Sequence, residues 1–457
     1  MNACKKIGKT IWNNRRLVFI FIFSFLAMSV FMTYVDGDVL WNYGFSYAIS
    51  NGEVPYVDFN MILPPFYSML MSLGLIFNQN IIVFYLENCL IITIMFYFLF
   101  KMFKEKAWIF LLFLIFPIPA VVFPTYNLFL IFLLVLIFYL EKNNGNDYLI
   151  GLLLGLMVFT KQTVGVCVLL VGIFYYLRKD FKKIRKRVLG FLIPCFLFLI
   201  YFVITGSLYE FFDYCLFGLF DFADGNANIN SIFFVIGLVF LGIVIYFIYK
   251  DRNSIFNWYM LAFFCVVIPL FDINHLSYFF FALLLLFMDK NFNFEKRIIK
   301  YYLLFCCFYM GMFFYSTSFT GFSYPNKYNN FNFRVLYNAS GENKIRDEVI
   351  KFINDNKSRE KIVILGSDAY FYKITCNMKI DHFDLLNKGN HGYNGKKKIK
   401  KMLDELPVGT ILIIDSEGNG NKNAPQFMED IAEYARSLGT EEKRLTGYTV
   451  YKKIDVL

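Results

Sequence analysis

The sequence predicts a polytopic α-helical membrane protein with a small α/β domain at its C-terminal end. Of the 457 residues, 58% are hydrophobic and 21% are aromatic, and the mean hydropathy is +0.51. A water-soluble fold of this composition would expose a large apolar surface. Several apolar stretches also approach the roughly 20 residues that a helix needs to cross a hydrocarbon core of about 30 Å. A membrane location is therefore expected.

About eleven membrane-spanning helices are predicted, because backbone groups in lipid must be hydrogen-bonded within their own segment. The continuous Phe, Leu and Ile runs lack the alternation of a barrel strand. The predicted spans are residues 17–35, 81–100, 107–123, 127–140, 148–160, 164–177, 188–205, 231–249, 256–271, 276–288 and 298–315.

The distribution of Lys and Arg predicts the orientation, since short loops rich in these residues stay in the cytoplasm. The basic cluster at residues 5–16 places the N-terminus in the cytoplasm, with no cleavage site that would indicate a signal peptide. Further basic loops at residues 101–106, 178–187, 250–252 and 290–300 alternate with loops that hold few positive charges. An odd number of spans then places the C-terminal domain outside the cytoplasm.

The segment from Pro64 to Phe77 is too short for a span and begins with two prolines. If it crossed the bilayer, every later basic loop would move to the outer side, which the charge bias disfavours. We therefore expect a juxtamembrane helix along the membrane surface. Residues 36–80 then form one long first outer loop within a transmembrane domain that covers residues 1–320.

Beyond residue 320 the composition changes to Asn, Lys, Asp, Glu and Gly, which indicates a soluble α/β domain at residues 330–457. Strands that alternate with helices favour a small parallel or mixed sheet. The predicted strands are residues 361–366 and 410–415, and the predicted helices are residues 342–356, 396–406 and 425–438.

A glycine-punctuated loop at residues 389–395 precedes the predicted helix at residues 396–406, which begins with a run of lysines. Loops of this kind at a helix N-terminus bind anions. The spacing matches neither a Walker loop nor a dinucleotide fingerprint, and a tight structural turn explains the glycines equally. Both interpretations stay open.

Cysteine usage and net charge exclude some classes of protein. Most of the nine cysteines lie in apolar helices, and no Cys or His spacing indicates zinc or a disulfide framework. The net charge of +10 comes largely from loops that are predicted to face anionic lipid in the cytoplasm. No nucleic-acid partner is expected.

The first outer loop combines three carboxylates, Asp36, Asp38 and Asp58, with aromatic residues that include Tyr67. Carboxylates can deprotonate an acceptor hydroxyl, or hold a divalent ion against a phosphate leaving group, and aromatic rings stack on sugars. The same residues also suit a turn after a helix and an aromatic membrane belt. If a divalent cation such as Mg or Mn takes part, Asp36 and Asp38 are its predicted ligands. The sequence requires no other cofactor.

Several short motifs occur together in one order. They are the acidic motif at residues 36–38, GEVPYVDF at residues 52–59, the Pro-Pro pair at residues 64–65 and GLLLGLMVFTKQT at residues 151–163. Over roughly residues 10–310 the arrangement resembles the GT-C membrane glycosyltransferases. It is most similar to their protein-mannosyltransferase and aminoarabinose-transferase branch, which is glycosyltransferase family 39-like.

The resemblance implies an inverting hexosyl- or pentosyltransferase that depends on a lipid-phosphate sugar. Such an enzyme moves a sugar from a polyprenyl-phosphate donor to a glycan, lipid or protein acceptor of the cell envelope, at the outer face of the plasma membrane. It implies that Asp36 is the catalytic base or orients the acceptor. Asp38 is expected to be a second base or a metal ligand, and Asp58 and Tyr67 are expected to bind the substrate or the lipid phosphate.

Lys161 is predicted at the outer end of a helix, against the trend of the other basic residues. A cation there needs a partner. The resemblance implies that it binds the donor phosphate with help from Gln162, although a lysine can also extend to lipid headgroups. His275 lies in an outer turn, where GT-C members carry Arg, His or Tyr near the lipid phosphate, although a lone histidine in a turn is also common as a structural residue. The Pro-Thr-Tyr-Asn turn at residues 124–127 needs no function to explain it.

Other functions stay open from the sequence. A small-solute transporter is disfavoured because the two halves show no visible similarity and the candidate polar groups gather at the outer face. A polysaccharide flippase or polymerase is a second alternative, although an Arg-rich outer loop would be expected in a polymerase and this one is acidic. A non-catalytic envelope membrane protein is the third, with Asp36 and Asp38 stabilising a turn.

Overall fold

The computed structural model describes most of the chain. The described residues are 14–31, 37–111, 124–177, 179–226, 231–268, 270–290, 328–331, 340–366, 369–384, 386, 388–415 and 425–455. The chain divides into two compact units. The first unit comprises Met1–Tyr34, Ile82–Phe196 and Ile229–Ser318, and the second comprises Val35–Ile81, Leu197–Asn228 and Phe319–Leu457.

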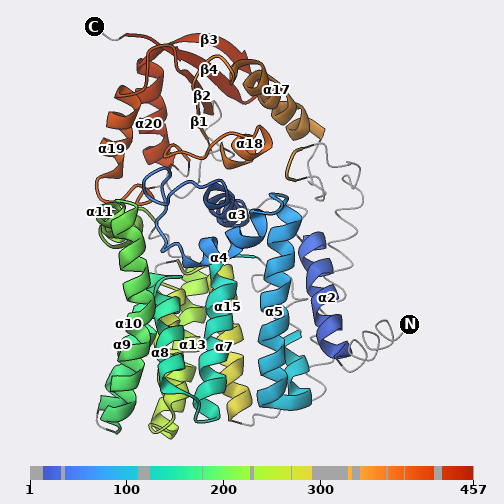
Figure 1. Cartoon of the computed structure of the whole chain (residues 1–457), viewed down its shortest axis with the longest axis vertical. Helices are drawn as coiled ribbons and strands as arrows, with labels where there is room; N and C mark the ends of the chain where they lie inside the picture. Colours follow the sequence, from blue (N-terminus) through green and yellow to red (C-terminus); the bar gives the residue numbers. More distant parts are fainter. Residues whose placement is uncertain are drawn as a thin grey trace. The chain divides into compact units, whose positions relative to one another are not determined.

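The first unit is built from apolar helices, several of which run side by side (Figure 1). Helix α9 packs against α8 and α14, and α15 packs against α7, α13 and α14. The elements are α2 (Arg15–Phe31), α5 (Ile81–Phe103), η1 (Lys104–Leu111), α7 (Tyr126–Lys142), α8 (Asp147–Val158), α9 (Gln162–Leu177), α10 (Phe181–Ile204), α13 (Ser231–Lys250), α14 (Ile255–Phe263), η3 (Phe264–Val266) and α15 (Ile273–Asp289). Helix α10 continues into the second unit.

Three helical stretches among the described residues are long and apolar enough to cross a membrane, judged by length and composition. They are Ile81–Leu111, Phe181–Ile204 and Ser231–Lys250. Shorter apolar helices confirm most of the other predicted segments as helical. The predicted span 298–315, and most of 107–123, lie outside the described residues, so the count of eleven spans stays a prediction.

Glycines of the GLLLGLMVFTKQT motif allow α8 and α10 to pack closely. A Cβ atom added at Gly151 would lie 2.0 Å from the backbone oxygen of Arg187, and one added at Gly155 would lie 2.3 Å from the ring of Pro194. Gly190 of α10 faces the backbone oxygen of Tyr148 in the same way, at 2.0 Å. Any larger side chain at these positions would force the two helices apart.

A buried ionic network joins the ends of five helices in the first unit. The guanidinium of Arg187, which is 4% exposed, donates to Glu141 Oε1 at 2.6 Å and to Asp147 Oδ1 at 2.8 Å. It also donates to the hydroxyl of Tyr259 at 3.1 Å. The hydroxyls of Tyr259 and Tyr176 both donate to Glu141, at 2.9 and 3.0 Å. The charges are thus paired and hydrogen-bonded, which is the condition for burying them.

The predicted outer loop is largely helical. Helix α3 (Gly37–Ser50) packs against α4 (Phe66–Leu75), which confirms a helix after the Pro-Pro pair. Between them the chain bends at Tyr56, whose φ is 72°. The Tyr56 hydroxyl donates to the backbone oxygen of Leu63 at 2.7 Å, and its N–H donates to the Phe59 oxygen at 2.9 Å. These bonds hold a residue type that seldom adopts a left-handed conformation.

The remainder of the second unit contains a mixed sheet of strand order β1-β2-β4-β3. Strands β1 and β2 are parallel, and β4 is antiparallel to both β2 and β3. The elements are α11 (Leu208–Phe212), the π-helix η2 (Asp213–Phe217), α12 (Gly218–Asn226), α17 (Ser340–Asn356), β1 (Ile362–Leu365), α18 (Ala369–Thr375), α19 (Gly395–Asp404), β2 (Ile411–Asp415), α20 (Pro425–Ser437), β3 (Gly439–Leu445) and β4 (Tyr448–Lys453).

Two strands and three helices of this part confirm the sequence predictions. Val363 of β1 and Leu412 of β2 share one buried core with Ile399 of α19 and Ile431 of α20. Strands β3 and β4 were not predicted. Strand β3 has the sequence GTEEKRL and is mostly exposed, so its pairing with β4 rather than any apolar pattern makes it a strand.

Candidate functional site

Of the two predicted catalytic carboxylates, only Asp38 lies in the part of the chain that the structure describes. Asp36 lies outside the described residues. Asp38 lies in the first turn of α3 and is partly exposed. Its backbone oxygen accepts a hydrogen bond of 2.6 Å from the side-chain amide of Asn42. A carboxylate in a first turn is favourable because it faces the positive end of the helix dipole.

Asp58 has a local structural role and Tyr67 is buried, so neither position requires a ligand to account for the residue found there. The exposed side chain of Asp58 accepts a bond of 2.6 Å from the Val54 N–H and so closes the bend after α3. Tyr67 is buried in α4. Substrate binding by either residue stays a prediction.

Lys161 lies in the turn between α8 and α9 and is only 9% exposed. Its Nζ atom is 3.5 Å from the side-chain oxygen of Asn127 and 5.3 Å from the ring centroid of Tyr126. Both of these residues begin α7. The turn at residues 124–127, whose sequence needs no function to explain it, therefore supplies two neighbours of Lys161, the predicted phosphate-binding lysine. A ring face and an amide oxygen both stabilise a cation.

His275 lies in the first turn of α15, and Asp272 orients it. The Asp272 carboxylate accepts from the His275 N–H at 2.8 Å, and its oxygens lie 2.8 and 2.9 Å from the ring Nδ1. The buried imidazole is near enough to Lys161 for their charges to interact. Gln162, the first residue of α9, is buried as well. We name Tyr126, Asn127, Lys161, Gln162 and His275 the Lys161 cluster.

A buried hydroxyl pair keeps the helix ends of the Lys161 cluster together. Thr125 Oγ1, just before α7, lies 3.2 Å from the hydroxyl of Tyr278 in α15. The cluster offers an ammonium, an imidazole and two carboxamides, while the nearby carboxylate of Asp272 bonds to His275. These groups suit the binding of an anion better than the removal of a proton from an acceptor.

No group of three or more His, Cys, Asp or Glu side chains among the described residues is placed to hold a metal ion. Asp36 lies beyond that part of the chain, so a Mg or Mn ion held by Asp36 and Asp38 stays a prediction.

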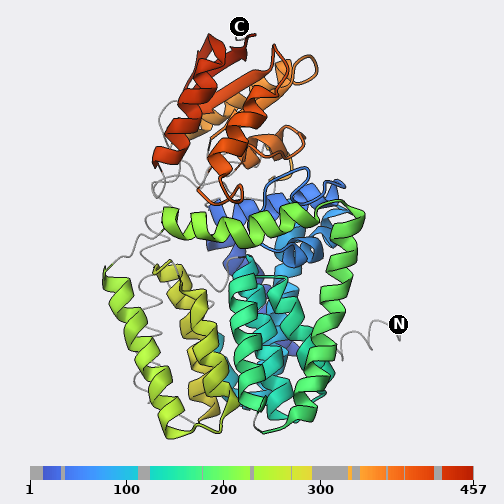
Figure 2. The same ribbon diagram turned by 90° about the vertical axis from the view of Figure 1, so that its left-hand side faces the viewer.

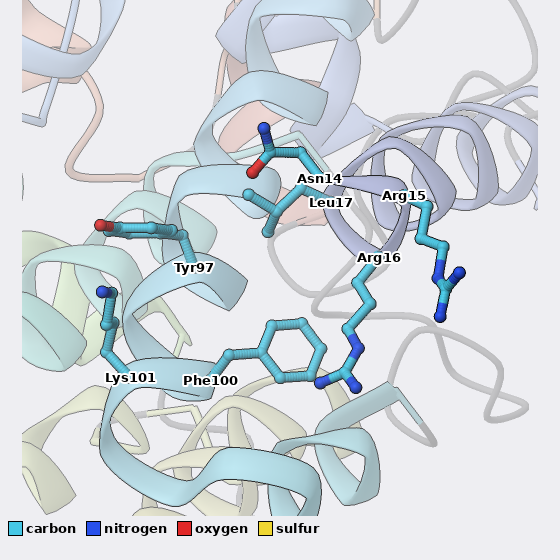
Figure 3. Close-up of a pocket in the computed structure, with 7 residues that line it drawn as sticks. All are labelled: Asn14, Arg15, Arg16, Leu17, Tyr97, Phe100 and Lys101. Atoms are coloured by element: carbon cyan, nitrogen blue, oxygen red, sulfur yellow. The ribbon is translucent and has the colours of Figure 1, made fainter. Parts of the chain in front are cut away.

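A pocket of about 540 Å³ lies between α2 and α5, and its lining includes no predicted site residue. It is lined by residues 14–17 of one segment and by Tyr97, Phe100 and Lys101 of the other. Figure 3 shows Lys101 and Arg16 on opposite sides of the Phe100 ring, with Arg15 directed away. Because these cations do not converge, the pocket provides no centre for one anionic ligand.

Glu53, within the GEVPYVDF motif, is a buried carboxyl group that the sequence analysis did not single out. Burial raises its pKa to about 7, while the backbone of Ile380 and the ammonium of Lys379 act in the opposite direction. The neighbouring charge of Asp58 raises the pKa further, and that of Lys373 lowers it. The burial of Glu53 arises from tertiary packing, so the sequence gives no sign that its pKa is raised.

Comparison with known proteins gives a family match and two similar structures. The model of glycosyltransferase family 87 matches residues 62–288. ArnT from Cupriavidus metallidurans in the apo state aligns with a TM-score of 0.60 at 12% identity, covering 98% of each chain. The Archaeoglobus fulgidus oligosaccharyltransferase in complex with Zn and sulfate aligns with a TM-score of 0.46 at 13% identity, covering 96% of this chain and 73% of that one. No curated protein matches the sequence.

The likeness to ArnT extends over nearly the whole chain, and at this identity it shows the fold. The family match supplies the activity, and its range includes Tyr67, Lys161, Gln162 and His275. Together they confirm the resemblance that the sequence motifs indicated. The chain is a membrane glycosyltransferase of the GT-C type.

Proposed function

We propose that the protein transfers a sugar from a polyprenyl-phosphate donor to a cell-envelope acceptor at the outer face of the plasma membrane, with inversion at the anomeric carbon. The observation that supports this proposal is the Lys161 cluster. It places a buried ammonium beside an amide and a tyrosine ring that both come from the start of α7, with the buried imidazole of α15 within electrostatic range.

A lipid-linked donor presents a phosphate at the level where apolar helices end. A buried ammonium with aligned donors can hold phosphate oxygens by charge-assisted hydrogen bonds, which are about twice as strong as neutral ones. Ionisable groups inside apolar helix bundles commonly mark substrate paths. Lys161 is the cation in this proposal, with Gln162 and His275 as further donors to the phosphate.

The chemical step is assigned to the first outer loop. Asp36 acts as the base that deprotonates the acceptor hydroxyl or orients it, and Asp38 acts as a second base or holds a divalent cation. Asp58 and Tyr67 contact the sugar or the acceptor. The acceptor is a glycan, lipid or protein of the envelope, the N-terminus is cytoplasmic, and residues 330–457 form an extracytoplasmic domain.

The test is transfer of labelled sugar from polyprenyl-phosphate donors to envelope acceptors by the purified full-length protein in nanodiscs. Wild type is compared with Asp36→Asn, with matched thermal unfolding as the folding control. The variant is expected to lose about 10²- to 10⁴-fold in rate, as when a general base is removed. Equal turnover would exclude Asp36 as the base. Transfer from nucleotide sugars but not from polyprenyl phosphates would exclude the donor class.

A further inference from the structure

Cys167 of α9 and Cys265 of η3 lie side by side in the first unit, although they are 98 positions apart in the chain. The Cys265 thiol donates a hydrogen bond to Cys167 Sγ, and the two sulfur atoms are 3.2 Å apart. Helix α9 packs along α14 and η3, among the apolar helices that run side by side in Figure 2. Helix packing creates this pair, so the spacing of the cysteines in the sequence gives no sign of it.

The helices that carry the two thiols are closely packed. Gly172, five residues after Cys167, faces Tyr259 of α14, and a Cβ atom added at this glycine would lie 3.1 Å from the tyrosine ring. Tyr259 comes six residues before Cys265, so the two contacts are those of antiparallel neighbours. The Tyr259 hydroxyl is in turn bonded to Arg187. The closeness of the two sulfur atoms is therefore supported by a second contact between the same helices.

The thiol pair is accessible to small neutral molecules. Both cysteines are half-buried. The neighbouring apolar side chains of Val166, Leu170 and Ile268 are 39% to 49% exposed. In a membrane protein such a face contacts lipid, which excludes charged reagents because their desolvation is costly. Hydrogen peroxide is small and uncharged, and it is an oxidant of the class that could reach this pair.

We propose that Cys167 and Cys265 form an oxidation site, at which a peroxide converts the two thiols into a disulfide between α9 and η3. Cys167 Sγ, which accepts the hydrogen bond, attacks one peroxide oxygen. The O–O bond breaks, the thiol proton leaves with the other oxygen as water, and Cys167 becomes a sulfenic acid. Cys265 Sγ then attacks the sulfenic sulfur, and the hydroxyl leaves with the Cys265 proton as a second water. The two sulfurs lose two electrons, which the peroxide gains.

The disulfide would constrain the start of α9, where Lys161 lies. Cys167 follows Lys161 by six residues, or about 9 Å along a helix, and Cys265 is near enough to Lys161 for their charges to interact. A disulfide requires a sulfur separation of about 2.05 Å, so side chains and backbone together must move by roughly 1 Å. A displacement of this size can cost about 100-fold in rate. Oxidation should therefore lower sugar transfer, and this consequence rests on the proposed role of Lys161 in donor binding.

Peptide mapping tests the oxidation site. The full-length protein in nanodiscs is treated with hydrogen peroxide, free thiols are alkylated, and the monomer band of a non-reducing gel is digested with trypsin. Tryptic peptides 162–178 and 253–290 each contain one cysteine, Cys167 and Cys265 respectively. We expect the two peptides to be joined in most molecules and to separate after treatment with dithiothreitol. Cys265→Ser should abolish the joined peptide, whereas Cys195→Ser, at a half-buried position of α10, should leave it unchanged.

Three results would each overturn the oxidation site. They are alkylation of both thiols after peroxide treatment, sulfinic acids at these positions without a joined peptide, and a disulfide that joins two protein chains instead of two helices of one chain. Since Ser is close to Cys in size, both variants should fold, and thermal unfolding verifies this.

Sugar transfer by the same samples tests the consequence for Lys161. Oxidised wild type should lose at least about tenfold in kcat/KM, and dithiothreitol should restore the rate. Cys265→Ser should keep its rate after peroxide treatment, which controls for oxidation elsewhere. An unchanged rate in molecules that carry the joined peptide would overturn the link to Lys161. A wrong donor class would instead appear in the reduced protein, as absence of transfer from polyprenyl phosphates.

Discussion

The ammonium of Lys161 lies 3.5 Å from the side-chain oxygen of Asn127, although the two residues are 34 positions apart in the chain. The turn between α8 and α9 supplies the cation, and the start of α7 supplies the amide. Helix packing therefore brings together Lys161, a predicted site residue, and Asn127, which belongs to a turn for which no function was predicted. Substitutions at Lys161 and at Asn127 both test this contact.

Replacing Lys161 by Met should weaken donor binding without disturbing the outer-loop carboxylates. Loss of a charged hydrogen bond of about 1.5–3 kcal/mol predicts roughly a 10- to 100-fold fall in kcat/KM, mostly through a higher KM for the donor. Lys161→Arg keeps the charge and should retain more of the activity. Steady-state kinetics with a polyprenyl-phosphate sugar would measure both. A fall in kcat at constant KM would instead place Lys161 in the chemical step.

Replacing Asn127 by Asp should also impair the donor site, through the opposite change in charge. A carboxylate beside Lys161 would pair with the ammonium and compete with the donor phosphate. We expect the donor KM to rise roughly tenfold, which is about 1.4 kcal/mol, while thermal stability is kept or raised. Asn127→Gln, which keeps a neutral amide, is the control. An unchanged KM in Asn127→Asp would show that Asn127 does not face the phosphate.

The helices around the Lys161 cluster were predictable because each apolar run is interrupted by polar residues. The Lys-Gln-Thr sequence at residues 161–163 separates two such runs, and the structure places the turn there. Strands β1 and β2 were predictable for a similar reason, since each is a short, fully apolar run with clear ends.

Features that depend on tertiary pairing were not predictable. Arg187 was counted as part of a cytoplasmic basic loop, whereas it lies inside α10 and is buried against Glu141 and Asp147. A count of positive charges cannot distinguish a solvated arginine from a neutralised one. Helix α3 was not predicted because its sequence, GDVLWNYGFSYAIS, mixes aromatic, polar and small residues and shows no clear helical pattern. The helix is stabilised by its packing against α4, which is a tertiary contact.

Replacing Arg187 by Met should destabilise the first unit. Removing the guanidinium leaves the carboxylates of Glu141 and Asp147, whose side chains are only 4% and 13% exposed, without their cation. Breaking a buried ion pair in this way costs about 3–5 kcal/mol. Arg185→Met is the matched control, because Arg185 is exposed two residues earlier in the same helix. Thermal unfolding in detergent should show a much larger loss for Arg187→Met. Equal losses would show that the network contributes little.

Replacing Gly392 by Ala should loosen the contact between the glycine-punctuated loop at residues 389–395 and Asp213 of η2. Alanine in the left-handed region costs about 1–2 kcal/mol, and here its Cβ would also approach Asp213 within 2.4 Å. Gly409→Ala isolates the backbone effect, since Gly409 has a φ of +88° but its nearest atom is 3.8 Å away. Hydrogen exchange of the Tyr393 and Asn394 amides should accelerate in the first variant only. Equal protection in both variants would contradict the tight fit.

Replacing Glu53 by Gln should remove part of the pH dependence of stability. Its pKa is raised from 4.5 to about 7 in the folded protein, so the folded state binds the proton more tightly than the unfolded state. The stability that Glu53 contributes is therefore complete below pH 4.5 and is lost as the pH rises to about 7.

We therefore expect Glu53→Gln to melt close to wild type at pH 4.5 and roughly 4 °C higher above pH 7, corresponding to about 1–2 kcal/mol. Asp58, Lys373 and Lys379 are present in both proteins, so their contributions largely cancel in the difference. Glu433→Gln, at an exposed position of α20, should show no such divergence. If the melting temperatures of wild type and Glu53→Gln stayed parallel across this range, folding would not raise the pKa of Glu53.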